Sequence, residues 1–329
     1  MEKIRQAADP SHKLSDLVID ILGIGRDATY RRMRGDTPIT FDEAVKLANH
    51  FKVSLSEVAG YSEDSALFKR PAFIRTIDDF RAYMHRSLKQ LEYIQQHKGH
   101  NMYYFAKDIP VFYHYMFPEL AGFKMYVWLK SVYGIDKLNN ENYDLSMIPA
   151  DLLDLAQKQW EIYSRINTVE IWNDTTILSL INQIAYYYEA GMLNSREEAL
   201  RICDCFNDMM KIVYKQALKG QKAHAGNTEV FTSASYKMYF HEILIMDNHI
   251  LAEYGEQKMI YFVPYAGVNF LSTADPDLTQ NMQDYLHHQI QKCSLISDIS
   301  EKDRNKFFIR IKSRLDQLKE RISNTDPFL

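Results

Sequence analysis

The sequence predicts a mainly α-helical protein in two parts: a small N-terminal helical domain, and a large helical C-terminal domain that contains a small antiparallel β meander. Two observations predict this class. The chain of 329 residues has 22 Tyr and 17 Phe but only 12 Gly, so it is rich in core-forming residues and poor in turns. Apolar residues also recur every three or four positions through most of the chain, as on the buried face of a helix.

The composition is that of an ordinary folded, soluble protein. Hydrophobic residues make up 46% and charged residues 25% of the chain, and the formal net charge is −4. The chain is long enough to bury a large core, and its length suits about two domains. A polar stretch that ends at Pro71 marks a boundary. We therefore expect three segments: an N-terminal domain at 1–62, a linker at 63–75 and a C-terminal domain at 76–329.

Short helices begin the N-terminal domain. We expect the first at Met1–Ala8, ended by Asp9-Pro10 because the residue before a proline is pushed out of the helical region. The second is expected at Leu14–Leu22, where apolar residues keep helical spacing. Either Ser11 or Ser15 would cap it.

Two capping boxes predict the start of two later helices in this domain. In Thr40–Glu43, the Thr hydroxyl and the Glu carboxylate can satisfy free backbone N–H groups at a helix start. Ser54–Glu57 repeats the pattern and would begin a short last helix through Val58. The buried side of the first of these helices is expected to consist of Ala44, Val45, Leu47, Ala48 and Phe51.

Between these helices, LGIGRDATYRRMRG (Leu22–Gly35) joins a tight Gly-Ile-Gly turn to a short positive helix. Its local charge is +3, from Arg26, Arg31, Arg32, Arg34 and Asp27. A helix of about ten residues spans roughly 15 Å, which suits the major groove of duplex DNA. A helix, a glycine-containing turn and a second helix with outward arginines form the sequence pattern of a helix-turn-helix.

Residues 13–60 resemble the Xre/lambda-repressor-like helix-turn-helix family, and most closely the BetR-type domains of bacterial transcription regulators. The resemblance lies in the LGI turn, the run Thr29–Arg32, the closing Arg34-Gly35 and the stretch ITFDEAVKLANHFKVSLSEV, which matches the family's fourth and fifth helices. Thr29 stands where the family usually has an apolar residue, and Gly25 replaces the usual Ser cap. Residues 103–129 show a weaker resemblance to the C-terminal regions of the same regulators, which implies no chemistry.

This resemblance implies a DNA-binding surface on the positive helix. Residues near its front are expected to face base edges: Arg26, Asp27, Tyr30 and Arg31. Contacts to phosphates, which fix position without reading sequence, are expected from Lys13, Arg34 and the N–H of Gly25. Residues 1–62 hold nine Lys plus Arg and nine Asp plus Glu, so binding would depend on arginines concentrated on one face. Met33 is expected to turn inward with Ile24. The alternative is a solvated, arginine-rich helix without a partner.

The C-terminal domain is expected to open with a helix from Thr76, which has Asp78 and Asp79 in its first turn. Its apolar stripe would consist of Ile77, Phe80, Met84, Leu88, Leu91 and Ile94. An aromatic run at 103–129 follows, and we interpret it as core, although a stacking platform for a ligand is the alternative. Pro118 within this run suits the first turn of a helix.

Further helices are expected at about 150–164, 175–191, 195–219, 277–293 and 301–323. Short β-rich runs separated by Asp247-Asn248 and by Gly255 predict the antiparallel meander, between about 236 and 272. We find no repeat of fixed 34-residue period, which argues against a helical solenoid.

The last helix carries a second apolar stripe: Phe308, Ile311, Leu315, Leu318 and Ile322. Two heptads are too few to define a coiled coil, so an ordinary core stripe and a dimer seam both fit. Regulators of this form usually place two recognition helices in successive major grooves, about 34 Å apart. We therefore expect a homodimer, with its contact in 72–329 and the 77–94 and 308–322 stripes as candidates.

The sequence offers no catalytic or metal site, so we expect neither an enzyme nor a bound cofactor or metal ion. It lacks a phosphate-binding glycine loop, a nucleophile elbow and an HExxH motif. Cys203 and Cys205 would point to different sides of a helix, and His97 and His100 lack partners at zinc-ligand spacing. We expect a cytoplasmic protein without a membrane segment, because no secretory signal or long apolar run is visible and three cysteines argue against a disulfide framework.

Three functions fit these observations. The leading one is a sequence-specific transcription regulator that binds double-stranded DNA, with a C-terminal domain for dimerisation or for sensing a small molecule or peptide. The second is a protein-interaction scaffold whose N-terminal helical domain binds protein. The third is a peptide-gated regulator, against which the β meander and the absence of repeats count.

Overall fold

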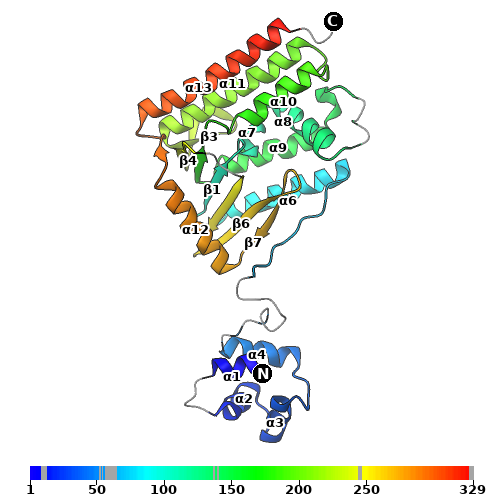
Figure 1. Cartoon of the computed structure of the whole chain (residues 1–329), viewed down its shortest axis with the longest axis vertical. Coiled ribbons are helices and arrows are strands. Elements are labelled where there is room, and N and C mark those ends of the chain that lie inside the picture. Colours follow the sequence, from blue (N-terminus) through cyan, green and yellow to red (C-terminus); the bar gives the residue numbers. More distant parts are fainter. Residues whose placement is uncertain are drawn as a thin grey trace. The chain divides into compact units, whose positions relative to one another are not determined.

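A computed structural model of the chain describes residues 1–8, 13–51, 53, 55, 65–135, 138, 141–243 and 247–325. The chain forms two compact units, Met1–Ala66 and Leu67–Leu329 (Figure 1). Each unit has its own hydrophobic core. The boundary between the units falls inside the segment where the sequence places a linker.

The first unit packs short helices around a small core. Its described helices are α1 (Glu2–Ala7), α2 (Leu14–Leu22), α3 (Arg26–Arg34) and α4 (Phe41–Phe51). Ile4, Val18 and Leu47 are buried at the centre. The capping box predicted for α4 is confirmed: the N–H of Thr40 donates to the Glu43 carboxylate at 2.9 Å, and the N–H of Glu43 donates to the Thr40 hydroxyl at 3.3 Å.

Helix α2 has the predicted bounds, Leu14–Leu22, but its N-cap differs from the prediction. The N-cap is Lys13, which makes no side-chain cap bond, and Ser15 is buried within the helix. Ser15 therefore cannot cap α2, because its backbone is already helical. Ser11 and Asp9-Pro10 lie outside the described residues, as does the second capping box, Ser54–Glu57, apart from Leu55.

The second unit is an α/β fold built on an eight-stranded mixed sheet, so the prediction of a mainly α domain with a small antiparallel meander is wrong. The strands are β1 (Asn101–Ala106), β2 (Thr168–Trp172), β3 (Gln221–His224), β4 (Asn227–Phe240), β5 (His249–Tyr254), β6 (Lys258–Tyr265), β7 (Asn269–Thr273) and β8 (Ser294–Leu295). Their order is β3-β4-β2-β1-β5-β6-β7, and β8 pairs with β4. Strands β4, β2 and β1 run parallel, and β5 to β7 extend the sheet as antiparallel pairs.

The strands missed by the prediction include the buried, parallel strands β1 and β2, and also the short antiparallel strands β3 and β8. The meander predicted at 236–272 corresponds to β5, β6 and β7, whereas β4 pairs with β2 and not with β5. Strand β2 is buried at every residue and β1 at all but the first. Burial on both faces removes the alternation of polar and apolar residues by which a strand is predicted. Strand β1 therefore could not be separated from the aromatic run around it.

The helices of the second unit include all those expected. They are α6 (Ile77–Gln95), α7 (Val111–His114), α8 (Pro118–Val127), α9 (Ala150–Tyr163), α10 (Leu178–Glu189), α11 (Arg196–Lys219), α12 (Pro276–Ile290) and α13 (Glu301–Asn324). Helix α8 continues as a π-helical turn at Trp128–Val132, and a 3-10 turn lies at Leu145–Met147. Thr76 and Asp79 form a capping box at the start of α6, and Pro118 begins α8 as predicted.

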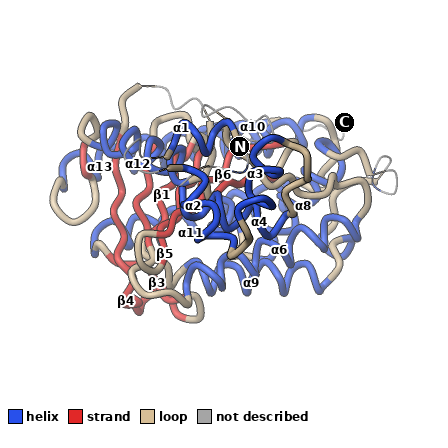
Figure 2. Tube along the Cα trace, turned by 90° about the horizontal axis from the view of Figure 1, so that it is seen from below, coloured by secondary structure: helices blue, strands red, loops and turns tan. Residues whose placement is uncertain are grey.

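Alternate side chains of the central strands face two different cores, as the pleat of a strand requires. Met102 and Tyr104 of β1 lie in the large core, whereas Tyr103 and Phe105 lie in the small one. Helix α12 covers the small core through the buried side chain of Leu286. In Figure 2, helices α6 and α9 lie to one side of the block of strands.

Both apolar stripes proposed as dimer seams are buried inside the second unit. Phe80 and Met84 of α6 are fully buried, and the α13 stripe from Ile311 to Ile322 is at most 4% exposed. Helix α13 packs along α11, beside which it runs in Figure 1. The core-stripe interpretation of α13 is therefore confirmed. The expectation that either stripe forms a dimer contact is wrong, because the same chain already covers both.

Candidate nucleic-acid interface

A short turn, Gly23–Gly25, joins α2 to α3. Gly23 has a φ of +66°, a left-handed conformation that favours glycine, and its N–H donates to the carbonyl of Ile19 at 2.8 Å, which ends α2. Gly25 is extended and forms the N-cap of α3. Gly35, with a φ of +85°, ends this nine-residue helix in the same left-handed way. The glycines thus set both ends of the positive helix.

The residues expected to contact DNA are all exposed on the first unit: Lys13, Gly25, Arg26, Asp27, Tyr30, Arg31 and Arg34. Asp27, Tyr30, Arg31 and Arg34 are three or four residues apart and therefore share one face of α3. Tyr30 is 43% exposed, so much of this aromatic side chain is accessible to a partner. The exposed face of α3 therefore combines an aromatic side chain, arginines and one carboxylate.

The arginines of α3 differ in their partners. Arg26 lies 3.6 Å from Asp16 of α2, and Arg34 lies 2.9 Å from Asp36 just beyond the helix. All four of these side chains are at least half exposed, so both ion pairs are weak. Within the described ranges, Arg31 forms no ion pair. Its guanidinium group is therefore the α3 cation with the least competition from the protein itself.

Arg32 has a structural role that the sequence did not reveal. Its Nε donates to both carboxylate oxygens of Glu43, at 3.1 and 3.0 Å, and Nη2 lies 2.9 Å from the same group. The hydrogen bond from Arg32, followed by that from Thr40, holds the pKa of Glu43 below its ordinary value. Arg32 therefore joins α3 to the capping box of α4. One sequence signal could have suggested the Arg32–Glu43 pair: Glu43 belongs to a predicted capping box that directly follows the arginine-rich helix.

The opposite side of α3 packs inward. Thr29 is fully buried, and its hydroxyl donates to the carbonyl of Gly25 at 3.2 Å, so this polar residue occupies an apolar position with its donor satisfied. Met33 and Ile24 are half-buried. The buried side of α3 is therefore at Thr29 and Met33. Arg32 packs against Glu43, and the other charged residues of α3 face outward.

Elsewhere in the described ranges, no group of three or more His, Cys, Asp or Glu side chains could hold a metal ion. Burial raises the pKa of the Cys203 thiol to about 12 and that of Cys205 to about 11, so both stay protonated at neutral pH.

Among all the residues that the structure describes, no helix is long and apolar enough to span a membrane. Comparison of the chain with protein families, with curated proteins and with solved structures finds no match.

Proposed function

We propose that this chain is a sequence-specific, DNA-binding transcription regulator. The first unit would bind double-stranded DNA, and the second unit would serve for sensing or dimerisation. The observation that carries the proposal is the exposed face of α3, on which Arg31 is unpaired within the described structure while Arg32 is used to pack the helix. The resemblance of residues 13–60 to BetR-type regulators agrees with this proposal, and it implies a bacterial, cytoplasmic protein.

The chemistry of the exposed face suits the major groove. A guanidinium group such as that of Arg31 can donate two parallel hydrogen bonds to O6 and N7 of guanine. The carboxylate of Asp27, one turn earlier, can accept from N4 of cytosine. Tyr30 lies between them in sequence and offers a hydroxyl together with an apolar ring. The face therefore carries groups for base readout as well as positive charge.

The paired arginines suit contacts to phosphates. Exposed ion pairs such as Arg26–Asp16 and Arg34–Asp36 contribute about 0–1 kcal/mol. A phosphate oxygen can therefore replace either carboxylate at little cost. Lys13 and the N–H of Gly25 lie at the starts of α2 and α3, and helix N-termini are common contacts to the backbone of DNA.

The proposal includes a homodimer that binds a pseudo-palindromic site. A single recognition helix contacts few base pairs, and one small module buries little surface on DNA. The contact would use a surface of the second unit other than the buried α6 and α13 stripes. Sedimentation of the full chain at micromolar concentrations tests this part, and a monomer there would remove the dimer from the proposal.

Retention of DNA at increasing salt concentrations tests the function. The full chain is mixed with labelled genomic fragments and an excess of unrelated competitor DNA. A regulator of this kind should retain specific fragments, and its affinity should fall steeply with salt, with a slope of about 0.9 for each phosphate contact. Absence of retention even at low salt would contradict DNA binding and favour the protein-interaction scaffold.

A further inference from the structure

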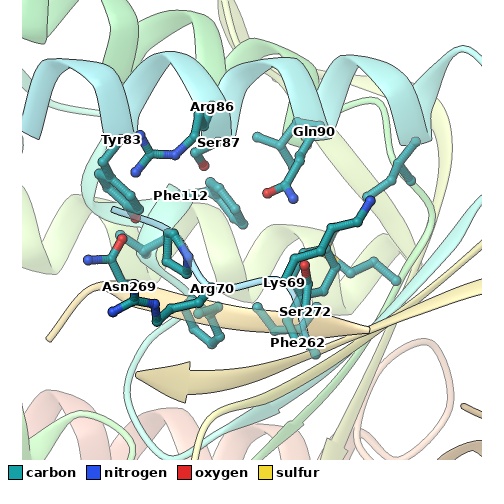
Figure 3. Close-up of a pocket in the computed structure, with 17 residues that line it drawn as sticks. Lys69, Arg70, Tyr83, Arg86, Ser87, Gln90, Phe112, Phe262, Asn269 and Ser272 are labelled. Carbon is teal, nitrogen blue, oxygen red and sulfur yellow. The ribbon is translucent and has the colours of Figure 1, made fainter. Parts of the chain in front are cut away.

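A mostly apolar pocket of about 280 Å³ lies in the second unit between α6 and strands β6 and β7. Figure 3 shows Tyr83, Arg86 and Ser87 on the helix side of this pocket and Asn269 on the strand side. The apolar lining includes Leu91, Ile94, Met102, Phe112, Ile250 and Phe262. The pocket is therefore an apolar space with a few polar groups placed at its walls, as is common for small-molecule sites.

Two of these polar side chains hold buried atoms that have no hydrogen-bond partner in the described structure. Asn269 is 1% exposed, and neither its Nδ2 nor its Oδ1 is bonded. Nη2 of Arg86 is likewise buried and unbonded. Buried polar groups in native proteins are nearly always satisfied, because they lose their bonds to water on folding. Asn269 and Arg86 thus present N–H donors and one carbonyl acceptor to a molecule in the pocket.

The charge of the pocket is positive. Lys69, Arg70 and Arg86 line it, and the described lining includes no Asp or Glu. No described residue forms an ion pair with Arg86, although part of its side chain is buried. A partly buried guanidinium group without a carboxylate partner favours an anionic ligand and disfavours a cationic one.

We propose that this pocket binds a small organic carboxylate with an apolar body. The carboxylate would accept hydrogen bonds from Nη2 of Arg86 and from Nδ2 of Asn269. A hydroxyl or amino group of the ligand would donate to Oδ1 of Asn269, and the apolar body would lie against the side chains of α6 and the sheet.

The volume of the pocket limits the size of this ligand. At about 280 Å³, the pocket lies near the lower end of the range of small-molecule sites, which is roughly 300–1,000 Å³. The pocket therefore suits a small metabolite.

One wall of the pocket is the segment with which the second unit begins. Lys69 and Ser272 of β7 exchange two backbone hydrogen bonds, of 2.7 and 3.1 Å, and Lys69 follows the first unit by only three residues. In Figure 3 this segment, with Lys69 and Arg70, crosses the strand side of the pocket. A bound anion would attract both cations and hold the segment on β7. An effect of the ligand on DNA binding, which rests on the proposed function, would follow from this contact.

Calorimetric titration of the full chain tests the site without DNA. The probes are 4-hydroxyphenylacetate, 4-hydroxybenzoate and hexanoate, together with the neutral amide of each and with tyramine as a cation. The proposal predicts that at least one carboxylate binds, at least tenfold more tightly than its amide, and that tyramine does not bind. Failure of all three carboxylates to bind at millimolar concentrations would overturn the proposal. Equal binding of acid and amide would also overturn the proposal.

Substitutions test whether the carboxylate binds at Arg86 and Asn269. Arg86→Gln and Asn269→Asp should each weaken the carboxylate at least tenfold, the first by removing the cation and the second by adding a repelling charge. Lys89→Gln, on the exposed side of the same helix and outside the pocket, should leave the affinity unchanged. Circular dichroism shows whether each variant folds. Unchanged affinity in both folded pocket variants would overturn the assignment.

A combined experiment on the full chain distinguishes failure of the pocket proposal from failure of the proposed DNA binding. DNA retention is measured with and without the best carboxylate. Carboxylate binding without any DNA retention would refute the regulator and keep the pocket. DNA retention with no binding of any carboxylate would refute the pocket and keep the regulator.

Discussion

Arg31 and Arg32 are neighbours on α3, yet only Arg32 is bound to the protein. The side chain of Arg32 is 18% exposed and lies 2.9 Å from the Glu43 carboxylate, whereas Arg31 is exposed and forms no ion pair within the described ranges. This difference divides the arginines of α3 into one that packs against the domain and others that are available to the proposed DNA partner. The two classes should respond differently to substitution.

Loss of the Arg32–Glu43 pair should destabilise the first unit. Arg32→Ala and Glu43→Gln should both increase hydrogen exchange in α3 and α4 of the full chain, because each variant removes bonds between the helices. Arg31→Ala is the matched control and should leave this exchange unchanged. Equal effects of Arg31→Ala and Arg32→Ala would show that the pair does not stabilise the unit.

The Arg32–Glu43 pair also predicts that the stability of the first unit decreases at acidic pH. Because the pKa of Glu43 is below its ordinary value of 4.5, the ionised carboxylate stabilises the folded unit above pH 4.5. This stabilisation is lost as the pH falls through the lower pKa of the folded state. In the wild type, hydrogen exchange in α3 and α4 should therefore increase as the pH falls below 4.5. Glu43→Gln has no carboxylate to protonate, so its exchange should increase less. An equal increase in both proteins would contradict the assignment.

Arg34 should contribute to binding on every DNA sequence. Arg34→Ala should lower the slope of affinity against salt by about one unit and weaken all sequences alike, because a phosphate contact carries no sequence information. Asp36→Asn is the complementary variant, and it should strengthen binding by removing the carboxylate that now pairs with Arg34. A change of preference at a single base pair in Arg34→Ala would place this residue at a base edge instead.

In the second unit, removal of one partner of the buried Glu170–Lys222 pair should be strongly destabilising. Both side chains are fully buried, with Nζ of Lys222 3.3 Å from Oε1 of Glu170. The carboxylate also accepts hydrogen bonds from Tyr113, Tyr163, Trp172 and Tyr236. Because Glu170→Gln leaves a buried cation uncompensated, it should lower the free energy of unfolding by about 3–5 kcal/mol in denaturant titrations.

Two comparisons of stability test the direct interaction between Glu170 and Lys222. Adding Lys222→Met to Glu170→Gln should cost less than the sum of the two single substitutions, because the residues interact directly. Lys211→Met removes an exposed pair with Asp208 and should change stability by no more than about 1 kcal/mol. Additive effects of the Glu170 and Lys222 substitutions would contradict a direct interaction.

Lys124 should make stability depend on pH. Burial lowers its pKa from 10.5 to about 8, and its ammonium group donates to the side chain of Gln183 at 2.6 Å. Between about pH 8 and 10.5 the unfolded chain holds a proton here that the folded chain has lost, so this lysine's contribution to stability rises with pH. Lys124→Met should therefore be more stable than the wild type at pH 7, and its advantage should shrink by up to about 1.4 kcal/mol per pH unit above pH 8. A constant difference in chemical denaturation from pH 7 to 10 would contradict the shift.

The sequence predicted those helices that bury one face and expose the other. The stripes of α6 and α13, the cap at Thr76 and the first-turn proline Pro118 are local signals, and the structure confirms them. Strand β2 could not be predicted in this way. Its central residue, Glu170, is polar yet fully buried, because side chains far away in the sequence satisfy it.

The same limit applies to the candidate sites. The exposed arginines of α3 could be recognised from their spacing, but the role of Arg32 depends on Glu43 in the next helix. The pocket depends on Arg86 and Asn269, which come together only when β7 joins the sheet beside α6. Periodicity cannot reveal such pairs, since it reports which face of one element is buried and not what lies opposite.

Selection of bound sequences from a random DNA pool, with the wild-type chain and with Arg31→Ala in parallel, tests the central claim most directly. The wild type should enrich a pseudo-palindromic motif. Arg31→Ala should lose preference at one base pair of each half-site, at a cost of about 1–3 kcal/mol there, and should keep the rest of the motif. No enriched motif with the wild-type chain, or the same motif with both proteins, would contradict the reading of DNA by Arg31 on α3.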